Sequence, residues 1–315
     1  MYLGKVMRKG FSKGVSRLNY DCVIIGGGIA GLQAAIQLGR YKHKVLVIDS
    51  GDGRSMLCRS YHNVLGYPDG VSGEHLREVG KNQAESLGVE FLLEKVEKIE
   101  KAKEGFEITV HNGGIYEGKR ILIATGVMDR LPNIPSLYPC LGESVYVCPD
   151  CDGYEIREQK TIVLGSGDVG ANMALTLSYW TDKLMYVNHE MKDVKPEILQ
   201  QLRDKKIDYY HQPIQDCLTI GHQFKGVILE NGEKLQANHG FVAFGSNEVK
   251  SQLAKQLGVE LLENKHIIVD PRSKMTNVKY VWAAGDVVAH SEQVTIAMGD
   301  GSQAAIWIHK SLVKE

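Results

Sequence analysis

The stretch DCVIIGGGIAG, residues 21–31, decides the fold of this chain. It opens with an apolar run rich in β-branched residues, which predicts a buried strand, and it closes in a glycine turn. Apolar residues at helical spacing follow, and a second apolar run ends at Asp49. This order of strand, glycine turn, helix, strand and acid predicts a βαβ unit that binds a dinucleotide.

Each key position of such a unit has a physical task. Gly26 permits the tight turn, Gly28 lets the backbone approach a pyrophosphate, and Gly31 lets the helix pack closely on the strand. The helix N-terminus then directs its free N–H groups and its dipole at the phosphates. Asp49 lies roughly 20 residues past the turn, where a carboxylate accepts a hydrogen bond from a ribose hydroxyl.

A second unit of the same kind begins near residue 160. A β-branched run leads into Gly165, Gly167 and Gly170, and a helical segment and another strand follow. Two such units in one chain predict two bound dinucleotides.

The residues after this second unit bear on the choice of nucleotide. Glu190 lies roughly 20 residues past the third glycine, a distance that suits the free ribose of NAD. The 2′-phosphate of NADP usually requires arginine at this place, and Lys192 and Lys195 are the nearest cations. The choice between NADPH and NADH therefore stays open.

Two cysteines two residues apart, Cys148 and Cys151, are followed at once by Asp152. Dithiol exchange needs an attacking thiolate, a resolving thiol and a group that handles the proton, and Asp152 stands where it can be that group. The alternative is half of a zinc site, which would need a second close pair of ligands. The remaining cysteines are scattered singly, so we expect a redox centre and no metal. They are Cys22, Cys58, Cys140 and Cys217.

Composition narrows the classes of protein. A chain of 315 residues is long enough for two domains, and 43% hydrophobic residues with 34 glycines are typical of an α/β protein. The net charge of −1 gives no reason to expect nucleic acid or an anionic membrane as partner. No apolar run reaches the roughly 18 residues of a membrane span.

Mostly unpaired cysteines fit a reducing compartment, so we expect a cytoplasmic location. Residues 1–19 are basic without acids and predict a solvated tail, with an organelle transit segment as the alternative.

Taken in order, the motifs resemble the low-molecular-weight thioredoxin reductases, a branch of the pyridine nucleotide-disulfide oxidoreductases. The resemblance covers residues 20–315. It rests on Gly26-x-Gly28-x-x-Gly31, Ala124-Thr125-Gly126, Cys148-x-x-Cys151-Asp152-Gly153, Gly165-x-Gly167-x-x-Gly170 and Gly285-Asp286.

The resemblance implies two Rossmann-like domains of three layers. An FAD-binding domain would comprise residues 20–127 and 248–315, and an NAD(P)-binding domain with the CxxC motif, residues 128–247, would be inserted into it. Members of this family are homodimers whose two domains rotate, which would place hinges near Gly126 and Gly245.

The resemblance also implies roles for single residues. Cys151 would lie against the flavin, Cys148 would attack the substrate disulfide, and Asp152 would protonate the departing thiolate. Gly285-Asp286 ends a predicted strand on a carboxylate, which suits hydrogen bonds to a ribityl or pyrophosphate group. The other implied FAD contacts are Asn63, Thr125, Gly126, Gln303 and Ala304.

We therefore expect an enzyme that passes electrons from a reduced nicotinamide, through FAD, to the Cys148–Cys151 disulfide and on to thioredoxin or a thioredoxin-like protein. Two departures keep alternatives open. The arginine-rich segment of the family is replaced by Asn188-His189-Glu190, and some relatives take electrons from ferredoxin instead. The region around the CxxC motif also resembles an offshoot that oxidises small dithiols with oxygen, although those enzymes often carry His where this chain has Asp152. A small-molecule dithiol oxidase or disulfide reductase is thus the other alternative.

Overall fold

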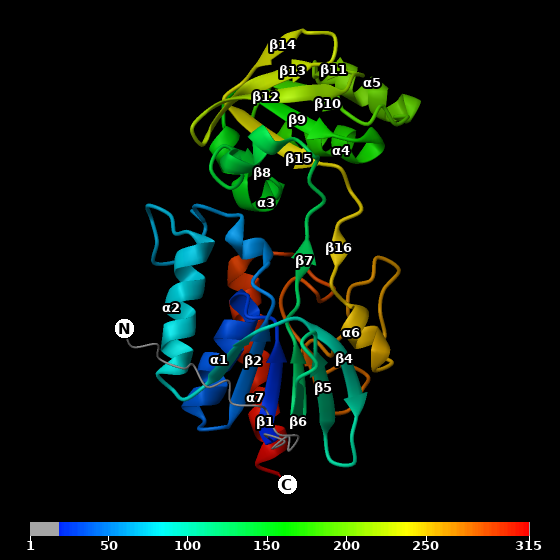
Figure 1. Ribbon diagram of the computed structural model, residues 1–315. Helices are drawn as coiled ribbons and strands as arrows, with labels where there is room; N and C mark the ends of the chain where they lie inside the picture. Colours follow the sequence, from blue (N-terminus) through cyan, green and yellow to red (C-terminus); the bar gives the residue numbers. More distant parts are fainter. Residues whose placement is uncertain (1–18, 315) are drawn as a thin grey trace, which may run out of the picture.

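The computed structural model describes residues 19–314 and consists of two α/β parts joined end to end (Figure 1). The predicted basic tail therefore lies outside the described residues, except for Asn19 at the start of β1. The first part contains both ends of the described chain, and the second part is built from the middle of the sequence (Figure 1).

The first part is centred on a mixed sheet whose inner strands are parallel. Residues Val45–Ile48 and Ile121–Ile123 are buried without alternation, as expected for strands covered on both faces. In spatial order the strands are β3 (Glu90–Leu93), β2 (Val45–Asp49), β1 (Asn19–Ile25), β6 (Ile115–Ile123), β5 (Phe106–Val110) and β4 (Val96–Lys101), with β17 (Val281–Ala283) also paired to β6.

Helices cover one face of this sheet. Small residues of α1 (Ile29–Arg40) and α7 (Val294–Leu312), including Ala34 and Ala304, allow the two helices to pack closely over the parallel strands. α2 (Gly73–Glu85) lies beside α1 (Figure 1). On the opposite face, a second core joins β4 and β5 to α6 (Gln252–Gln256). The result is a three-layer arrangement.

The second part repeats the plan with a parallel sheet. Its helices α4 (Gly167–Leu177) and α5 (Pro196–Asp204) pack on one face, and a small antiparallel sheet packs on the other. The parallel strands, in order, are β11 (Asp208–Tyr210), β10 (Leu184–Asn188), β9 (Thr161–Gly165), β15 (His239–Ala243) and β8 (Val145–Tyr146), and the antiparallel strands are β12 (Ile214–Ile220), β13 (Gln223–Leu229) and β14 (Lys234–Gln236).

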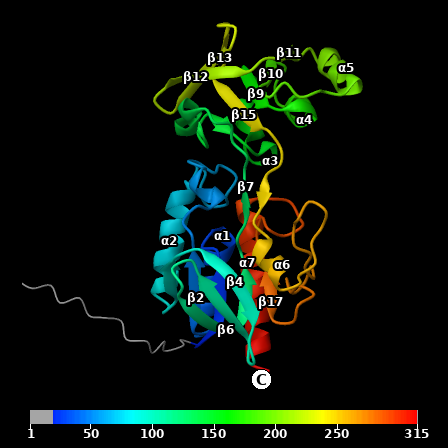
Figure 2. The ribbon, with the colours of Figure 1, turned by 45° about the vertical axis from the view of Figure 1, so that its right-hand side comes forward.

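The chain passes between the parts through two short strands that pair antiparallel, β7 (Val127–Met128) and β16 (Glu248–Val249) (Figure 2). Side chains tie these crossovers together. Thr125 Oγ1 donates to the carbonyl of Lys250 at 2.5 Å. Asn247 donates through Nδ2 to Asp129 Oδ1 at 3.1 Å and accepts from the backbone N–H of Arg130 at 3.1 Å.

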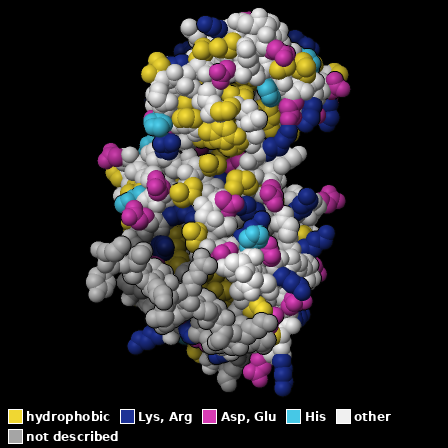
Figure 3. Space-filling view, viewed as in Figure 1, with side chains coloured by type: hydrophobic (Ala, Val, Ile, Leu, Met, Phe, Trp, Pro, Cys, Tyr) yellow, Lys and Arg dark blue, Asp and Glu magenta, His cyan; other side chains and the backbone are white. Residues whose placement is uncertain are grey.

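The observed architecture confirms the predicted fold class, with two Rossmann-like α/β units, one inserted into the other. Among the helices of residues 19–314, none is both long and apolar enough to cross a membrane. Acidic and basic side chains are interspersed over the face seen in Figure 3, in keeping with the balanced charge of the sequence.

Candidate functional site: a dinucleotide cavity beside a disulfide

A cavity of about 640 Å³ opens in the first part, where the parallel strands end. Its volume lies within the range of roughly 300–1,000 Å³ that is usual for cofactor sites. Most of the residues predicted for FAD line this cavity: Gly26, Gly28, Asp49, Thr125, Gly126, Gly285 and Asp286. The sequence prediction and the geometry therefore point to the same place.

The first glycine turn forms a cradle that only glycine permits. Gly26 has a φ of 104°, and a Cβ there would lie 2.3 Å from the carbonyl oxygen of Ala124. A Cβ on Gly31 would lie 1.9 Å from the carbonyl oxygen of Gly26, so the helix packs directly on the turn. Gly28 has nothing within 4 Å of its Cβ position and lies open to the cavity. This backbone fits the close approach of a pyrophosphate.

Asp49 is held at the edge of the cavity by two donors. Its Oδ1 accepts from the backbone N–H of Gly27 at 3.0 Å, and its Oδ2 accepts from Arg77 Nη2 at 2.6 Å. A carboxylate fixed in this way is suited to accept from ribose hydroxyls. Together with the cradle, it makes the residues of this cavity fit FAD.

The structure does not bring three of the predicted residues to this cavity. α7 points into the cavity only with its N-terminal turn, so Gln293, Val294 and Ala297 line it. Gln303 lies about two and a half turns after Val294, and its side chain instead donates to the carbonyl of Arg272 at 2.7 Å. Ala304 is fully buried in the helix-side core of the first part, and Asn63 is exposed on its loop.

Cys148 and Cys151 form a disulfide with a Cα–Cα distance of 5.3 Å. Cys148 precedes the short helix α3 (Pro149–Asp152), and its Sγ accepts from the backbone N–H of Cys151 at 3.2 Å. The disulfide is directed at the first part, where a second cavity of about 80 Å³ is lined by both cysteines and Asp152. The two cavities share a wall formed by Arg54, Tyr61, Asp286, Gln293 and Val294. The disulfide therefore lies next to the dinucleotide cavity.

Asp152 lies in the small cavity with a strongly altered acidity. Burial raises its pKa from 3.8 to about 7, the charge of Glu155 adds to the rise, and the charge of Arg54 opposes it. A carboxyl group in this state can hold a proton near neutral pH and release it to a nearby thiolate.

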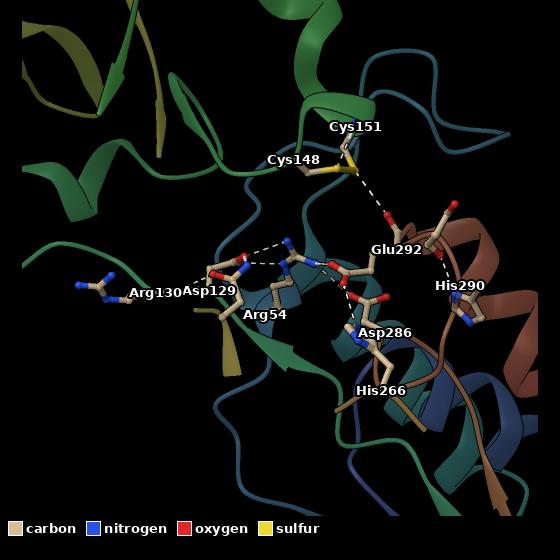
Figure 4. Close-up of polar contacts among 11 residues, drawn as sticks. Arg54, Asp129, Arg130, Cys148, Cys151, His266, Asp286, His290 and Glu292 are labelled. Atoms are coloured by element: carbon tan, nitrogen blue, oxygen red, sulfur yellow. Dashed lines mark hydrogen bonds and ion pairs between the residues drawn. A yellow bond between two sulfur atoms is a disulfide. The ribbon is translucent and has the colours of Figure 1, made fainter. Parts of the chain in front are cut away.

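A partly buried charge cluster surrounds Arg54 beneath the disulfide (Figure 4). Arg54 binds Asp129 through two hydrogen bonds, Nε–Oδ2 at 2.6 Å and Nη2–Oδ1 at 2.9 Å. Its Nη1 lies 3.4 Å from Asp286 Oδ2 and contacts Glu292, which is also 3.5 Å from His266. Burial raises the pKa of Asp129 and of Asp286 although Arg54 opposes the rise.

Sequence reasoning missed this cluster. Residues 54–70 show no periodicity, and Arg54 lies in a short 3₁₀ turn, η1 (Arg54–Met56). A lone arginine in an irregular loop carries no local signal of a buried partner.

The second glycine loop has the packing that a dinucleotide turn requires. A Cβ on Gly170 would lie 2.4 Å from the ring of Tyr186, and one on Gly165 would lie 2.7 Å from the carbonyl oxygen of Ala243. Gly167, with a φ of 52°, donates its N–H to Asn188 Oδ1 at 3.0 Å. These contacts set the start of α4 at the end of β9, so the loop fits a dinucleotide.

Glu190, the predicted ribose ligand, follows β10 at the edge of this loop. Its carboxylate contacts the guanidinium of Arg130 and lies 2.8 Å from Nζ of Lys192. Arg130 belongs to the crossover after β7 and was not predicted as a site residue.

Comparisons with known proteins agree with this geometry. Residues 20–301 match the family model described as pyridine nucleotide-disulphide oxidoreductase. The thioredoxin reductase of Aquifex aeolicus is 31% identical in an alignment of length 307 that covers 93% of this chain and 93% of its own.

Among solved structures, that of HlmI is 28% identical with a TM-score of 0.84 and covers 94% of this chain and 93% of its own. The thioredoxin reductase of Lactococcus lactis in its FR conformation is also 28% identical and covers 94% and 100%, but its TM-score is 0.60. The family model matches most of the chain, one relative is more than 30% identical, and the glycine loops, the cavity and the disulfide are all present. This chain therefore belongs to the pyridine nucleotide-disulphide oxidoreductase family and is a thioredoxin reductase-like oxidoreductase.

Proposed function

We propose that this protein passes an electron pair from a reduced nicotinamide dinucleotide, through FAD in the large cavity, to the Cys148–Cys151 disulfide. The dithiol then reduces thioredoxin or a thioredoxin-like protein. The observation that carries the proposal is the wall shared by the two cavities, because it supports electron transfer between FAD bound in the large cavity and the neighbouring disulfide. Bound FAD would supply the two-electron carrier there.

The proposed division of labour follows the two parts of the molecule. Residues 20–127 and 248–315 would bind FAD, and residues 128–247 would bind NADPH or NADH and carry the disulfide. HlmI and the Lactococcus enzyme in its FR conformation are equally identical to this chain, yet their TM-scores differ. We take this difference to reflect a second arrangement of the two domains, reached by bending the crossovers, in which the nicotinamide domain delivers the nucleotide.

The chain's own residues can carry the disulfide exchange. After reduction, the Cys148 thiolate would attack one sulfur of the substrate disulfide, whose S–S bond breaks. The departing thiolate would take the proton of Asp152, which is suited to this step by its pKa of about 7. Cys151 would then displace the substrate sulfur from Cys148 and restore the intramolecular disulfide.

The small cavity favours a second candidate, turnover of a small dithiol or disulfide. Its volume of about 80 Å³, between the disulfide and aromatic residues such as Tyr61 and Tyr146, is far too small for a protein. A compact thiol compound could meet the disulfide here without a change in domain arrangement. Oxidation of such a dithiol would pass electrons in the reverse direction, to FAD and then to oxygen.

The test is anaerobic. Purified FAD-loaded protein is mixed with NADPH and, separately, with NADH, and the visible flavin absorbance is followed. Rapid bleaching followed by turnover of a bacterial thioredoxin supports the proposal. Bleaching by neither nucleotide overturns the nicotinamide step, and reduction by ferredoxin would then identify the donor. Hydrogen peroxide from a small dithiol, without thioredoxin turnover, would select the second candidate. The homodimer and the cytoplasmic location stay predictions from the sequence.

A further inference from the structure

The ribose end of the second dinucleotide site is built around one carboxylate with two cations. Glu190 contacts the Arg130 guanidinium and lies 2.8 Å from Lys192 Nζ. Its pKa is lowered to about 2, first by the contact with Lys192, and the contact with the Arg130 guanidinium lowers it further. Glu190 is therefore an ionised carboxylate at neutral pH, and it lies two residues past the end of β10, the strand after which units of this kind bind the ribose of a dinucleotide.

Arg130 is fixed by the crossover that carries it. Its backbone N–H donates to Asn247 Oδ1 at 3.1 Å, and its Nη1 donates to the carbonyl of Phe244 at 3.2 Å. The neighbouring residue Asp129 is bound by Arg54 of the first part. Arg130 is thus held from both ends with its charge committed to Glu190. The side chain of Lys192 contacts the same carboxylate but is largely exposed, and its backbone carbonyl accepts from Asn188 Nδ2 at 2.6 Å.

These contacts decide what the site can accept. A free 2′-hydroxyl can donate to the Glu190 carboxylate, which Arg130 and Lys192 hold in position. A 2′-phosphate would bring about two negative charges to that carboxylate. Arg130 and Lys192 are already paired with the carboxylate, and Lys195 Nζ lies 3.4 Å from Asp168 Oδ2. Specificity for NADH then arises from the repulsion between Glu190 and the 2′-phosphate of NADPH as much as from the hydrogen bond between Glu190 and the 2′-hydroxyl of NADH.

We propose that the Arg130–Glu190–Lys192 cluster makes the second dinucleotide site select NADH and reject the 2′-phosphate of NADPH. Arg130 acts as a positioning residue, and Glu190 is the residue that reads the ribose. The inference rests on the proposed function, since it names the nucleotide that would serve the proposed electron transfer.

Equilibrium binding tests the inference without any electron transfer. NAD⁺ and NADP⁺ are titrated calorimetrically into the FAD-loaded protein, so that the FAD site is filled. The wild type should bind NAD⁺ at least tenfold more tightly. Glu190→Gln removes the repelling charge and frees Arg130 and Lys192, so the affinity for NADP⁺ should rise tenfold or more and the preference for NAD⁺ should shrink by at least that factor. Arg130→Met removes a cation but keeps the carboxylate, so the preference for NAD⁺ should persist or widen. Glu197→Gln, at an exposed acid on α5, is the matched control and should change neither affinity.

The outcomes separate this inference from the proposed function. Equal affinities in the wild type, tighter binding of NADP⁺, or an unchanged ratio in Glu190→Gln overturns the inference and leaves the proposed function standing. Binding of neither nucleotide to the wild type overturns the nicotinamide step itself. Far-ultraviolet circular dichroism of each variant shows whether it is folded, because Glu190 lies outside the part that would bind the flavin. If Glu190→Gln does not fold, a preference for NAD⁺ that shrinks in Arg130→Met overturns the inference.

Discussion

The sharpest test of the disulfide site is Asp152→Asn, because it removes one proton-binding group and almost no volume. In the folded protein the pKa of Asp152 is about 7, against 3.8 for the free side chain. That difference corresponds to about 4 kcal/mol between the protonated and ionised forms. The cause is burial first and the charge of Glu155 second, so the penalty falls on the ionised form.

The direction of the effect follows from proton linkage. Between pH 4 and 7 the folded protein holds a proton on Asp152 that the unfolded chain has released. Stability therefore falls as the pH rises through this window and stays at its lower level above it. From pH 5.5 to 8.5 the wild type should lose about 2 kcal/mol through Asp152. The asparagine variant cannot ionise and should not show this loss.

The assay is urea unfolding of the oxidised, FAD-loaded protein at both pH values, read by tryptophan fluorescence, since Trp180 packs against Gly153 beside the motif. The quantity of interest is the difference in unfolding free energy between variant and wild type at each pH. Asp150→Asn is the matched control, because Asp150 is exposed two residues away. A variant-minus-wild-type difference that is the same at both pH values would refute a raised pKa for Asp152. If Asp152 is also the proton donor, the variant should turn over disulfides roughly 10²–10⁴-fold more slowly.

Four further substitutions test the remaining parts of the site. In Gly28→Ala the new Cβ would enter open space at an ordinary φ of −74°, so urea unfolding of the FAD-free protein should be unchanged. The same Cβ would stand in the way of the pyrophosphate, so FAD binding, measured by flavin fluorescence, should weaken tenfold or more. Gly26→Ala should instead lower the unfolding free energy by about 2 kcal/mol or more, because its φ of 104° and the carbonyl of Ala124 exclude a Cβ; an unchanged urea midpoint would contradict this. Arg54→Met removes the cation that faces the buried Asp129 carboxylate and should cost about 3–5 kcal/mol. Part of this loss should be recovered in the double variant with Asp129→Asn; no recovery would show that the two residues do not act as a pair. Cys151→Ser should abolish disulfide turnover while the nucleotide still bleaches the flavin, and residual turnover would exclude Cys151 as a member of the redox pair.

The local patterns of the sequence were enough to identify both dinucleotide units. A βαβ unit is determined by neighbours in sequence, because strand, turn and helix follow one another and each glycine acts on the turn that contains it. The same holds for the disulfide, whose two cysteines lie one helical turn apart. For this reason local sequence alone predicted that Gly26, Gly28 and Asp49 would meet at one turn and that Cys148 and Cys151 would lie together, and the structure places them so.

The structure places Gln303 and Ala304, both predicted from the C-terminal segment, away from the cavity. Their positions depend on contacts that are distant in sequence. Whether Gln303 or Gln293 reaches the cavity depends on where α7 begins and on the angle at which it meets the sheet. Both are set by packing of α7 on α1, between residues more than 250 positions apart. Periodicity shows that a helix is present, but it does not show which turn of the helix faces a cofactor.

The electrostatics of the site were decided by the tertiary structure alone. Arg54 binds Asp129 and Glu292 across 75 and 238 positions, and Arg130 reaches Glu190 across 60. A buried charge must find a partner, but any of the many charged residues in the sequence could be that partner until the chain is folded. The sequence therefore determined the two binding units and the redox pair through contacts that are local. Only the folded chain decided which charges surround them, because those contacts join segments that are distant in sequence.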